Sequence, residues 1–160
     1  MKEFRKVAAG GTFDELHRGH RVLLLKAFEI GERVLIGLCS DEFVKKLGKP
    51  HVTASYEERL KELRNFLSNL CVAERAEIIQ LDNPFGPAVT DQCIEAIVVS
   101  DETESTANQI NVQRARKGLT PLTIIAINMV PSEDCSPIST TRIRRGEIDR
   151  EGRLTKKRLQ

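Results

Sequence analysis

The most informative stretch of the chain is Gly10-Gly11-Thr12-Phe13-Asp14-Glu15-Leu16-His17-Arg18-Gly19-His20. It lies between the apolar runs at residues 7–9 and 22–28, so it predicts a strand, a glycine turn and then a helix. A helix N-terminus after a strand exposes unpaired backbone N–H groups, which suit phosphate. The first turn of this helix carries His20, and two imidazoles add further donors to phosphoryl oxygens. The pattern therefore favours phosphate chemistry over one solvated and one helix-capping histidine.

The composition is typical of one globular domain. The chain has 160 residues, of which 40% are hydrophobic and 30% charged. Its net charge of +2 is too small to indicate nucleic-acid binding, although the C-terminus is locally basic. We expect a domain over residues 1–152 and a solvated basic tail over residues 153–160. The sequence does not determine the oligomeric state.

The four cysteines do not form a metal-binding pattern, and whether any two of them form a disulfide stays open. They lie far apart without a CxxC pair, and we expect Cys39 and Cys71 to be buried reduced thiols. No apolar run approaches the roughly 20 residues that span a bilayer, and no signal-peptide pattern opens the chain. These features predict a cytoplasmic protein without a membrane segment.

Strand and helix patterns alternate along the chain. Strands are expected at residues 7–9, 34–38, 78–81, 96–99 and 122–127, with helices beginning near His20 and at residues 42–47, 56–70 and 103–117. Strands separated by helices pair in parallel through right-handed crossovers. The sequence therefore predicts one doubly wound, Rossmann-like α/β domain with a parallel sheet, which binds ligands beyond the carboxyl ends of its strands.

A second segment, Ser136-Pro137-Ile138-Ser139-Thr140-Thr141-Arg142-Ile143-Arg144, follows the last expected strand and should return to that edge. A helix N-cap needs only one hydroxyl, whereas this segment has three in succession. Arg142 and Arg144 add positive charge beside them. Hydroxyls beside arginines favour a phosphate-binding segment.

These two segments resemble the signatures of the His-Xaa-Gly-His nucleotidyltransferase superfamily. Gly11-Thr12-Phe13-Asp14 leading to His17-Arg18-Gly19-His20 matches its N-terminal signature, and residues 138–144 resemble its C-terminal one. From about residue 6 to residue 152, the chain resembles the archaeal phosphopantetheine adenylyltransferases more closely. The internal passages that carry this resemblance are Gly37-Leu38-Cys39-Ser40-Asp41-Glu42-Phe43, Tyr56-Glu57-Glu58-Arg59, Val98-Val99-Ser100-Asp101-Glu102-Thr103 and Ile110-Asn111. The chain departs from bacterial members at Glu15, where they often have proline, and it has no match to their arginine-containing ATP loop after Val99.

The resemblance implies transfer of the adenylyl group of ATP to 4'-phosphopantetheine, giving dephospho-coenzyme A and pyrophosphate. Mg²⁺ is expected to accompany ATP. No carboxylate cluster has metal-ligand spacing, so no dedicated metal site is predicted, and Asp14 is interpreted as a turn-forming residue. Two alternatives stay open, namely another nucleotidyltransferase of the superfamily and a regulatory module that binds nucleotides without turnover.

The resemblance also implies the roles of individual residues. His20 stabilises the transition state at the α-phosphate, His17 contacts the ATP phosphates, and Thr12 lies between the two substrates. The family uses a lysine after the second strand for substrate phosphate, and of Lys45, Lys46 and Lys49 we select Lys46 by its distance from Asp41. The expected catalytic residues are His20, His17, Thr12 and Lys46. The expected nucleotide-binding residues are Gly11, Thr12, Phe13, His17, His20, Ser139, Thr140, Thr141 and Arg142.

Three further residues have an uncertain role in the sequence. His51 follows Pro50 and is interpreted as a surface histidine, with contact to a substrate as the minor alternative. Arg59 lies off the apolar stripe of its helix, so a solvated charge and a contact with the rim of the site are weighed equally. Glu102 is interpreted as a helix cap rather than a ribose ligand.

Overall fold

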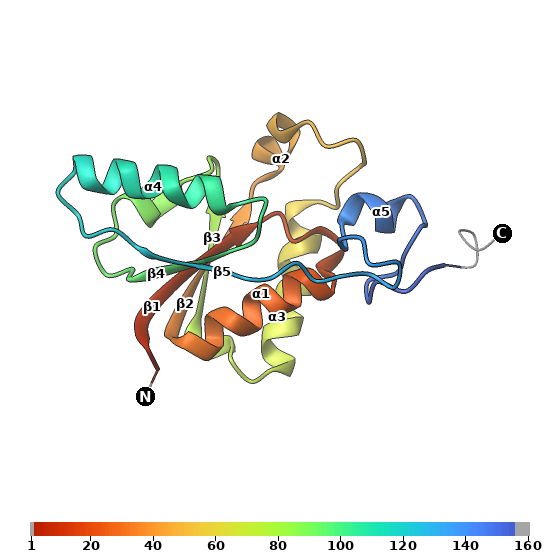
Figure 1. The fold of residues 1–160 in the computed structure, drawn as a ribbon, viewed down its shortest axis with the longest axis horizontal. Coiled ribbons are helices and arrows are strands. Elements are labelled where there is room, and N and C mark those ends of the chain that lie inside the picture. Colours follow the sequence, from red (N-terminus) through yellow and green to blue (C-terminus); the bar gives the residue numbers. More distant parts are fainter. Residues whose placement is uncertain (1, 156–160) are drawn as a thin grey trace.

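Five parallel strands form the central sheet, in the order β3-β2-β1-β4-β5 (Figure 1). The computed structural model describes residues 2–155 of the chain. The strands are β1 (Phe4–Gly11), β2 (Gly31–Cys39), β3 (Ala76–Leu81), β4 (Ala96–Val99) and β5 (Thr123–Ala126). The parallel pairing, and the reversal of strand order between β1 and β4, confirm the predicted doubly wound α/β fold.

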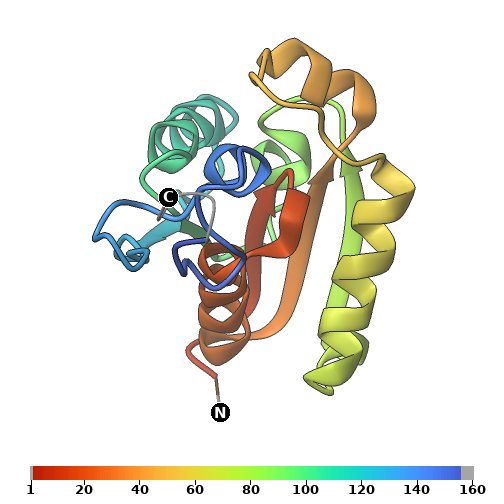
Figure 2. The same cartoon turned by 90° about the vertical axis from the view of Figure 1, so that its right-hand side faces the viewer.

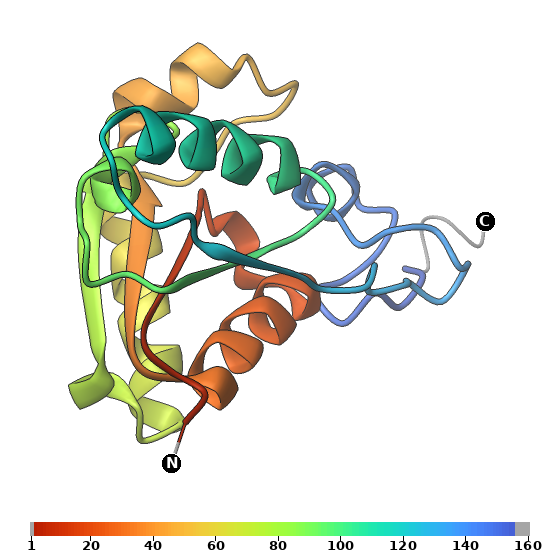
Figure 3. The same cartoon turned by 60° about the vertical axis from the view of Figure 1, so that its left-hand side comes forward.

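Helices cover both faces of this sheet (Figure 3). They are α1 (Arg18–Ile30), α2 (Asp41–Leu47), α3 (Tyr56–Asn69), α4 (Glu104–Arg116) and α5 (Thr140–Arg144), with the 3₁₀ turns η1 (Asp14–Leu16), η2 (Ala73–Arg75) and η3 (Gly86–Val89). The helices α1 and α3 pack on one face, and α4 and η3 pack on the other. Successive residues of a strand point to opposite faces, so Val34 and Ile36 belong to the first core and Leu35 to the second.

The carboxyl ends of the strands lie at the same end of the molecule as α2 and α5, away from the start of β1 (Figure 2). The hydroxyl of Thr140 at the start of α5 donates to the Asp14 carbonyl, just beyond β1, over 3.0 Å. This contact joins the two segments that the sequence analysis singled out. It places them where a doubly wound sheet binds its ligands.

Serine residues cap the two helices that follow β2, which lie at the expected places. The Ser40 hydroxyl accepts from the Phe43 N–H at 3.1 Å at the start of α2, and the Ser55 hydroxyl accepts from the Glu58 N–H at 3.3 Å at the start of α3. On α3, Leu63 is fully buried against the sheet. The sequence pattern therefore located both helix starts and the core-facing side of α3.

Arg59 of α3 is a structural residue with only 2% of its surface exposed, so of its two alternatives the solvated charge is wrong and the contact with the rim of the site is confirmed. Its guanidinium donates to the carbonyls of Thr12 at 2.9 Å, Cys39 at 2.8 Å and Ala54 at 2.9 Å. It also bonds to the Asp41 carboxylate at 3.1 Å. These carbonyls follow β1, end β2 and precede α3. One side chain therefore holds together three segments that surround the carboxyl ends of the strands.

The cysteines agree with the sequence analysis only in part. All four are free thiols, and Cys39 is buried as expected. Cys71 is exposed, which contradicts the expectation, because it lies in the turn after α3 with a left-handed φ of 59°. The apolar residues around it in sequence therefore do not bury its thiol.

The C-terminal segment contacts the rest of the domain where the structure describes it, and the predicted tail is described only as far as residue 155. Arg150 Nε lies 3.0 Å from Glu15 Oε2, and the Leu154 N–H donates to Glu133 Oε2 at 2.8 Å. Residues 156–160, which include most of the predicted basic run, lie outside the described residues. No helix within residues 2–155 is long and apolar enough to cross a bilayer.

Replacing Arg59 with methionine should lower the free energy of unfolding by about 3–5 kcal/mol, because it leaves three carbonyls without their buried donor. Urea denaturation at neutral pH measures this change. Arg64→Met, an exposed position on the same helix, is the matched control and should stay within about 0.5 kcal/mol of the wild type. Equal stability of the two variants would contradict the structural role of Arg59.

Candidate active site

A cleft of about 270 Å³ lies beyond the carboxyl ends of β1, β4 and β5. It is lined by residues from the start of α1, the α2–α3 loop, the β4–α4 turn and the segment that leads into α5. The polar residues of the lining are His17, His20, Lys49, His51, Ser100, Asp101, Glu102, Asn128, Ser139, Thr140 and Thr141. The cleft therefore gathers imidazoles, an ammonium group and hydroxyls from separate segments, together with the carboxylates of Asp101 and Glu102 in the β4–α4 turn.

The two histidines of α1 cap the helix reciprocally. The Nδ1 atom of His17 accepts from the His20 N–H at 3.3 Å, and Nδ1 of His20 accepts from the His17 N–H at 3.3 Å. Their rings stack with centroids 3.6 Å apart. Because both Nδ1 atoms are acceptors, we infer that each neutral ring carries its proton on Nε2. The cap thus fixes the tautomer that offers two N–H donors.

Gly19 leaves the space that this arrangement needs. A Cβ atom at residue 19 would lie 2.9 Å from Cε1 and 3.1 Å from Nδ1 of His17. Real Cβ atoms do not approach so closely, and the His17 ring is held by its cap and by its stack on His20. The glycine between the histidines is therefore required by the position of the first imidazole.

Burial keeps both imidazoles neutral. It lowers the pKa of His17 to about 4, with the positive charge of Arg21 as the next cause. Burial also lowers the pKa of His20 well below its ordinary value, and the neighbouring His17 adds to this effect. The charge of Lys49 lowers the pKa of both rings, which places its ammonium group near them. Near pH 7 the two histidines therefore act as neutral N–H donors.

Asp14 connects three segments of the site. Its carboxylate accepts from Nε and one terminal nitrogen of Arg144, both at 2.8 Å, and from the Ala54 N–H at 3.2 Å. Burial alone would raise the pKa of Asp14, but the hydrogen bonds from Arg144 and Ala54 lower it below its ordinary value. The residue lies in the turn, as expected, and it also ties α5 and the α2–α3 loop to the end of β1.

The turn that carries Asp14 adopts an unusual backbone. Phe13 and Glu15 have left-handed φ values of 52° and 58°, which residues with side chains rarely adopt. Proline, whose ring fixes φ near −65°, does not fit at residue 15 in this turn. The difference from the bacterial signature at Glu15 therefore corresponds to a different turn geometry.

The structure divides the expected nucleotide-binding residues into two groups. His17, His20, Ser139, Thr140 and Thr141 line the cleft. A second group lies outside its lining, namely Gly11, Thr12, Phe13 and Arg142. Of this second group, Phe13 contacts the cleft residue His20. The two rings meet edge-on, with their centroids 5.3 Å apart.

Arg142 is held by protein groups on every side. Its guanidinium bonds to Asp134 at 2.7 Å, to Glu147 at 3.0 Å, to the Ser132 hydroxyl at 2.9 Å and to the Pro137 carbonyl at 3.0 Å. Hydrogen bonds to the two carboxylates raise its pKa above the ordinary value. In this structure Arg142 therefore holds in place the segment that carries the hydroxyls of residues 139–141.

Lys49, rather than Lys46, lines the cleft. Lys46 lies on α2 and is exposed, while Lys49 follows the end of that helix at Gly48, whose left-handed φ of 63° turns the chain. Counting residues from Asp41 did not reveal this turn. The geometry favours Lys49 for an interaction with a bound anion.

Two other residues differ from their interpretation in the sequence. The His51 side chain is only 7% exposed and lines the cleft, so the interpretation as a surface histidine is wrong. Glu102 also lines the cleft, while the N-cap of α4 is Thr103, which makes no side-chain cap bond. No local pattern distinguishes His51, because its burial depends on the distant Asp14.

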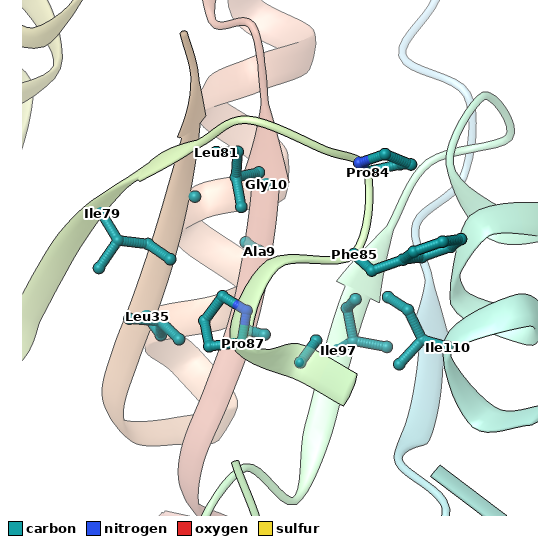
Figure 4. A pocket seen from close by; sticks show the side chains of 13 residues that line it. Ala9, Gly10, Leu35, Ile79, Leu81, Pro84, Phe85, Pro87, Ile97 and Ile110 are labelled. Atoms are coloured by element: carbon teal, nitrogen blue, oxygen red, sulfur yellow. The ribbon is translucent and has the colours of Figure 1, made fainter. Parts of the chain in front are cut away.

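An apolar pocket lies on the other side of β1, beneath the β3–η3 loop (Figure 4). Figure 4 shows Pro84 and Phe85 of this loop above the strands, with Ile110 of α4 beside them. The absence of a side chain at Gly37 makes room for Leu81, since a Cβ atom there would lie 2.5 Å from its Cδ1. The pocket reaches Gly10 at the end of β1, one residue before the turn that leads to the cleft.

The fold and the cleft together define an α/β protein built for phosphate-bearing ligands. Residues 8–146 match the cytidylyltransferase-like family model. A curated relative from Methanothermobacter thermautotrophicus, named phosphopantetheine adenylyltransferase, is 46% identical over 98% of this chain and 93% of its own length. The relative of the same name from Pyrococcus horikoshii is 45% identical over 99% of both chains.

Among solved structures, a protein of unknown function from Archaeoglobus fulgidus is 31% identical. It has a TM-score of 0.69 and covers 77% of this chain and 89% of its own. The chain therefore belongs to the cytidylyltransferase-like family, and within it to the archaeal phosphopantetheine adenylyltransferases.

The free energy of unfolding should fall as the pH decreases from about 7.5 to about 5. In this range His17 and His20 bind protons in the unfolded chain but stay neutral in the folded protein, where their pKa values are lowered. For His17, this stability is complete above the ordinary pKa of 6.5 and is lost as the pH falls toward about 4. The midpoint of thermal unfolding measures the change. His17→Asn keeps an acceptor for the cap but does not titrate, so its midpoint should depend less on pH. An identical pH dependence in the variant would contradict the account.

Proposed function

We propose that this chain transfers the adenylyl group of ATP to 4'-phosphopantetheine, producing dephospho-coenzyme A and pyrophosphate. The observation that carries the proposal is the pair of capped, neutral imidazoles in one cleft with the hydroxyls of Ser139, Thr140 and Thr141. The relatives that share the whole length of the chain bear the name of this activity. The two lines of support are independent, since one rests on geometry and the other on sequence identity.

In the proposed reaction, an oxygen of the acceptor phosphate attacks the α-phosphorus of ATP. The bond from this phosphorus to the oxygen that bridges to the β-phosphate breaks, and pyrophosphate leaves with that oxygen. The acceptor is already a nucleophile, so the protein aligns the two groups and stabilises charge that moves onto the leaving group. Preorganised N–H donors in a partly buried site supply that stabilisation.

The proposed role of each cleft residue is either to align the two substrates or to stabilise the charge on the leaving group. His20 donates from Nε2 to the α-phosphate in the transition state, and His17 donates to the neighbouring phosphates. The segment of Ser139, Thr140 and Thr141 holds the β- and γ-phosphates, while Arg142 positions this segment through its bonds to Asp134 and Glu147. We assign the acceptor phosphate to Lys49, which lines the cleft, instead of Lys46.

The apolar pocket supports the choice of acceptor. Its lining of leucine, isoleucine, proline and phenylalanine side chains suits an extended organic arm better than a second nucleotide phosphate. It begins at Gly10, and the cleft with the histidines follows directly after β1. The pocket has a volume of about 50 Å³, so the proposal places only part of the pantetheine arm in it, with the phosphate toward the cleft.

Mg²⁺ enters the proposal as the partner of ATP. Within residues 2–155, no group of three or more His, Cys, Asp or Glu side chains is arranged to hold a metal ion. The ATP phosphates are hard oxygen ligands that bind Mg²⁺ themselves. A cytoplasmic location also belongs to the proposal, and the four free thiols support it.

Pyrophosphate release measured with a panel of acceptors tests this function. The wild type with ATP and Mg²⁺ should release pyrophosphate with 4'-phosphopantetheine, but not with nicotinamide mononucleotide, flavin mononucleotide or glycerol 3-phosphate. A preference for another acceptor would identify a different nucleotidyltransferase. Binding of ATP without turnover on any acceptor would indicate a regulatory module.

His20→Ala should reduce turnover by about 10²–10³-fold, since it removes a donor to the transition state. The matched variant His20→Asn keeps an acceptor for the His17 N–H but lacks Nε2, and it should lose as much turnover while its thermal unfolding stays near that of the wild type. Near-normal adenylyl transfer by His20→Asn would refute the catalytic role.

A further inference from the structure

We propose that His51 is a third substrate-binding imidazole, whose Nε2 atom binds a phosphate oxygen of one of the two substrates. The identity of these substrates, ATP and 4'-phosphopantetheine, rests on the proposed function above. The residue comes from the α2–α3 loop, outside both signature segments.

The loop that carries His51 is fixed on the side of the cleft. The Ala54 N–H donates to the Asp14 carboxylate at 3.2 Å, and the Ala54 carbonyl accepts from Arg59 Nε at 2.9 Å. Arg59 is itself anchored on the carbonyls of Thr12 and Cys39. The position of the loop is therefore set by the same buried groups that hold the ends of β1 and β2.

The His51 ring is oriented by its Nδ1 atom. This atom lies 3.3 Å from the Val52 carbonyl and 3.9 Å from Asp14 Oδ2. Two oxygen atoms beside one ring nitrogen favour a proton on that nitrogen. Nε2 is thereby left as the ring nitrogen without an oxygen atom beside it.

Nε2 of His51 is a buried polar atom without a hydrogen-bond partner among the described residues. Its side chain is only 7% exposed, and the ring forms part of the cleft wall. Leaving a buried polar atom unpaired costs free energy, and such an atom in a native structure calls for an explanation. A ligand atom that occupies the cleft is the partner that its position favours.

The side chains that line the cleft with His51 favour a phosphate as that ligand. Lys49, His17 and His20 line the same cleft and offer positive charge or N–H groups. A hydrogen bond between Nε2 and a phosphate oxygen needs one proton between the two atoms. A phosphate can meet this need, because the proton can be bound either to its oxygen or to Nε2. The carboxylate of Asp14 lies 3.9 Å from Nδ1, the other nitrogen of the ring.

Binding of matched ligand pairs, measured by calorimetry without turnover, tests the role of His51. One pair is 4'-phosphopantetheine and pantetheine, and the other is ATP and adenosine. His51→Ala should weaken one phosphorylated ligand by about 10–100-fold, the loss expected for a hydrogen bond to a charged group, and leave its unphosphorylated partner unchanged. The pair that changes identifies the substrate whose phosphate His51 binds.

Two controls separate binding from folding. Val52→Ala changes the adjacent residue, which is 84% exposed, and should leave all four affinities unchanged. Equal weakening of a phosphorylated ligand and its unphosphorylated partner by His51→Ala would overturn the proposal in favour of a purely structural role. Unchanged affinity for both phosphorylated ligands would overturn it as well. Pyrophosphate release by the wild type reports on the proposed function separately, because it does not depend on the result for His51.

Discussion

The ion pair between Asp14 and Arg144 is the interaction on which the cleft depends. The carboxylate is 98% buried and accepts two bonds from the guanidinium, each 2.8 Å long. A buried carboxylate is unfavourable unless it is paired and hydrogen-bonded, and here Ala54 supplies a third donor. Because the partners come from α5 and from the α2–α3 loop, satisfying one charge brings together segments that lie 130 residues apart.

The electrostatics of the cleft follow from burial. His17 and His20 carry little charge near neutral pH because their pKa values are lowered, and their Nδ1 atoms are committed to the helix cap. Neutral donors do not bind ATP as strongly as two cations would in the ground state. They are nevertheless fixed in position before charge moves onto the leaving group, which is the condition for lowering a reaction barrier. The proposed activity uses this rigidity.

Sequence patterns predicted what depends on nearby residues. The alternation of strands and helices and the two signature segments have local spacing that a sequence displays. Between the two alternatives for Arg59, and for the wrong interpretation of His51 as a surface residue, the deciding contacts come from distant segments. The left-handed turn at Gly48, after which Lys49 lines the cleft, is not visible in the spacing of lysines from Asp41. Tertiary contacts of single polar side chains are therefore the part of this site that the local sequence does not reveal.

A double-mutant cycle on Asp14→Asn and Arg144→Met, measured as kcat/KM for pyrophosphate release, tests the central claim most directly. If one buried ion pair assembles the cleft, either change alone removes that pair and the double variant loses little more than Asp14→Asn. The account predicts a coupling of about tenfold or more in kcat/KM. Losses that simply multiply would show that the two residues act independently and would contradict the account.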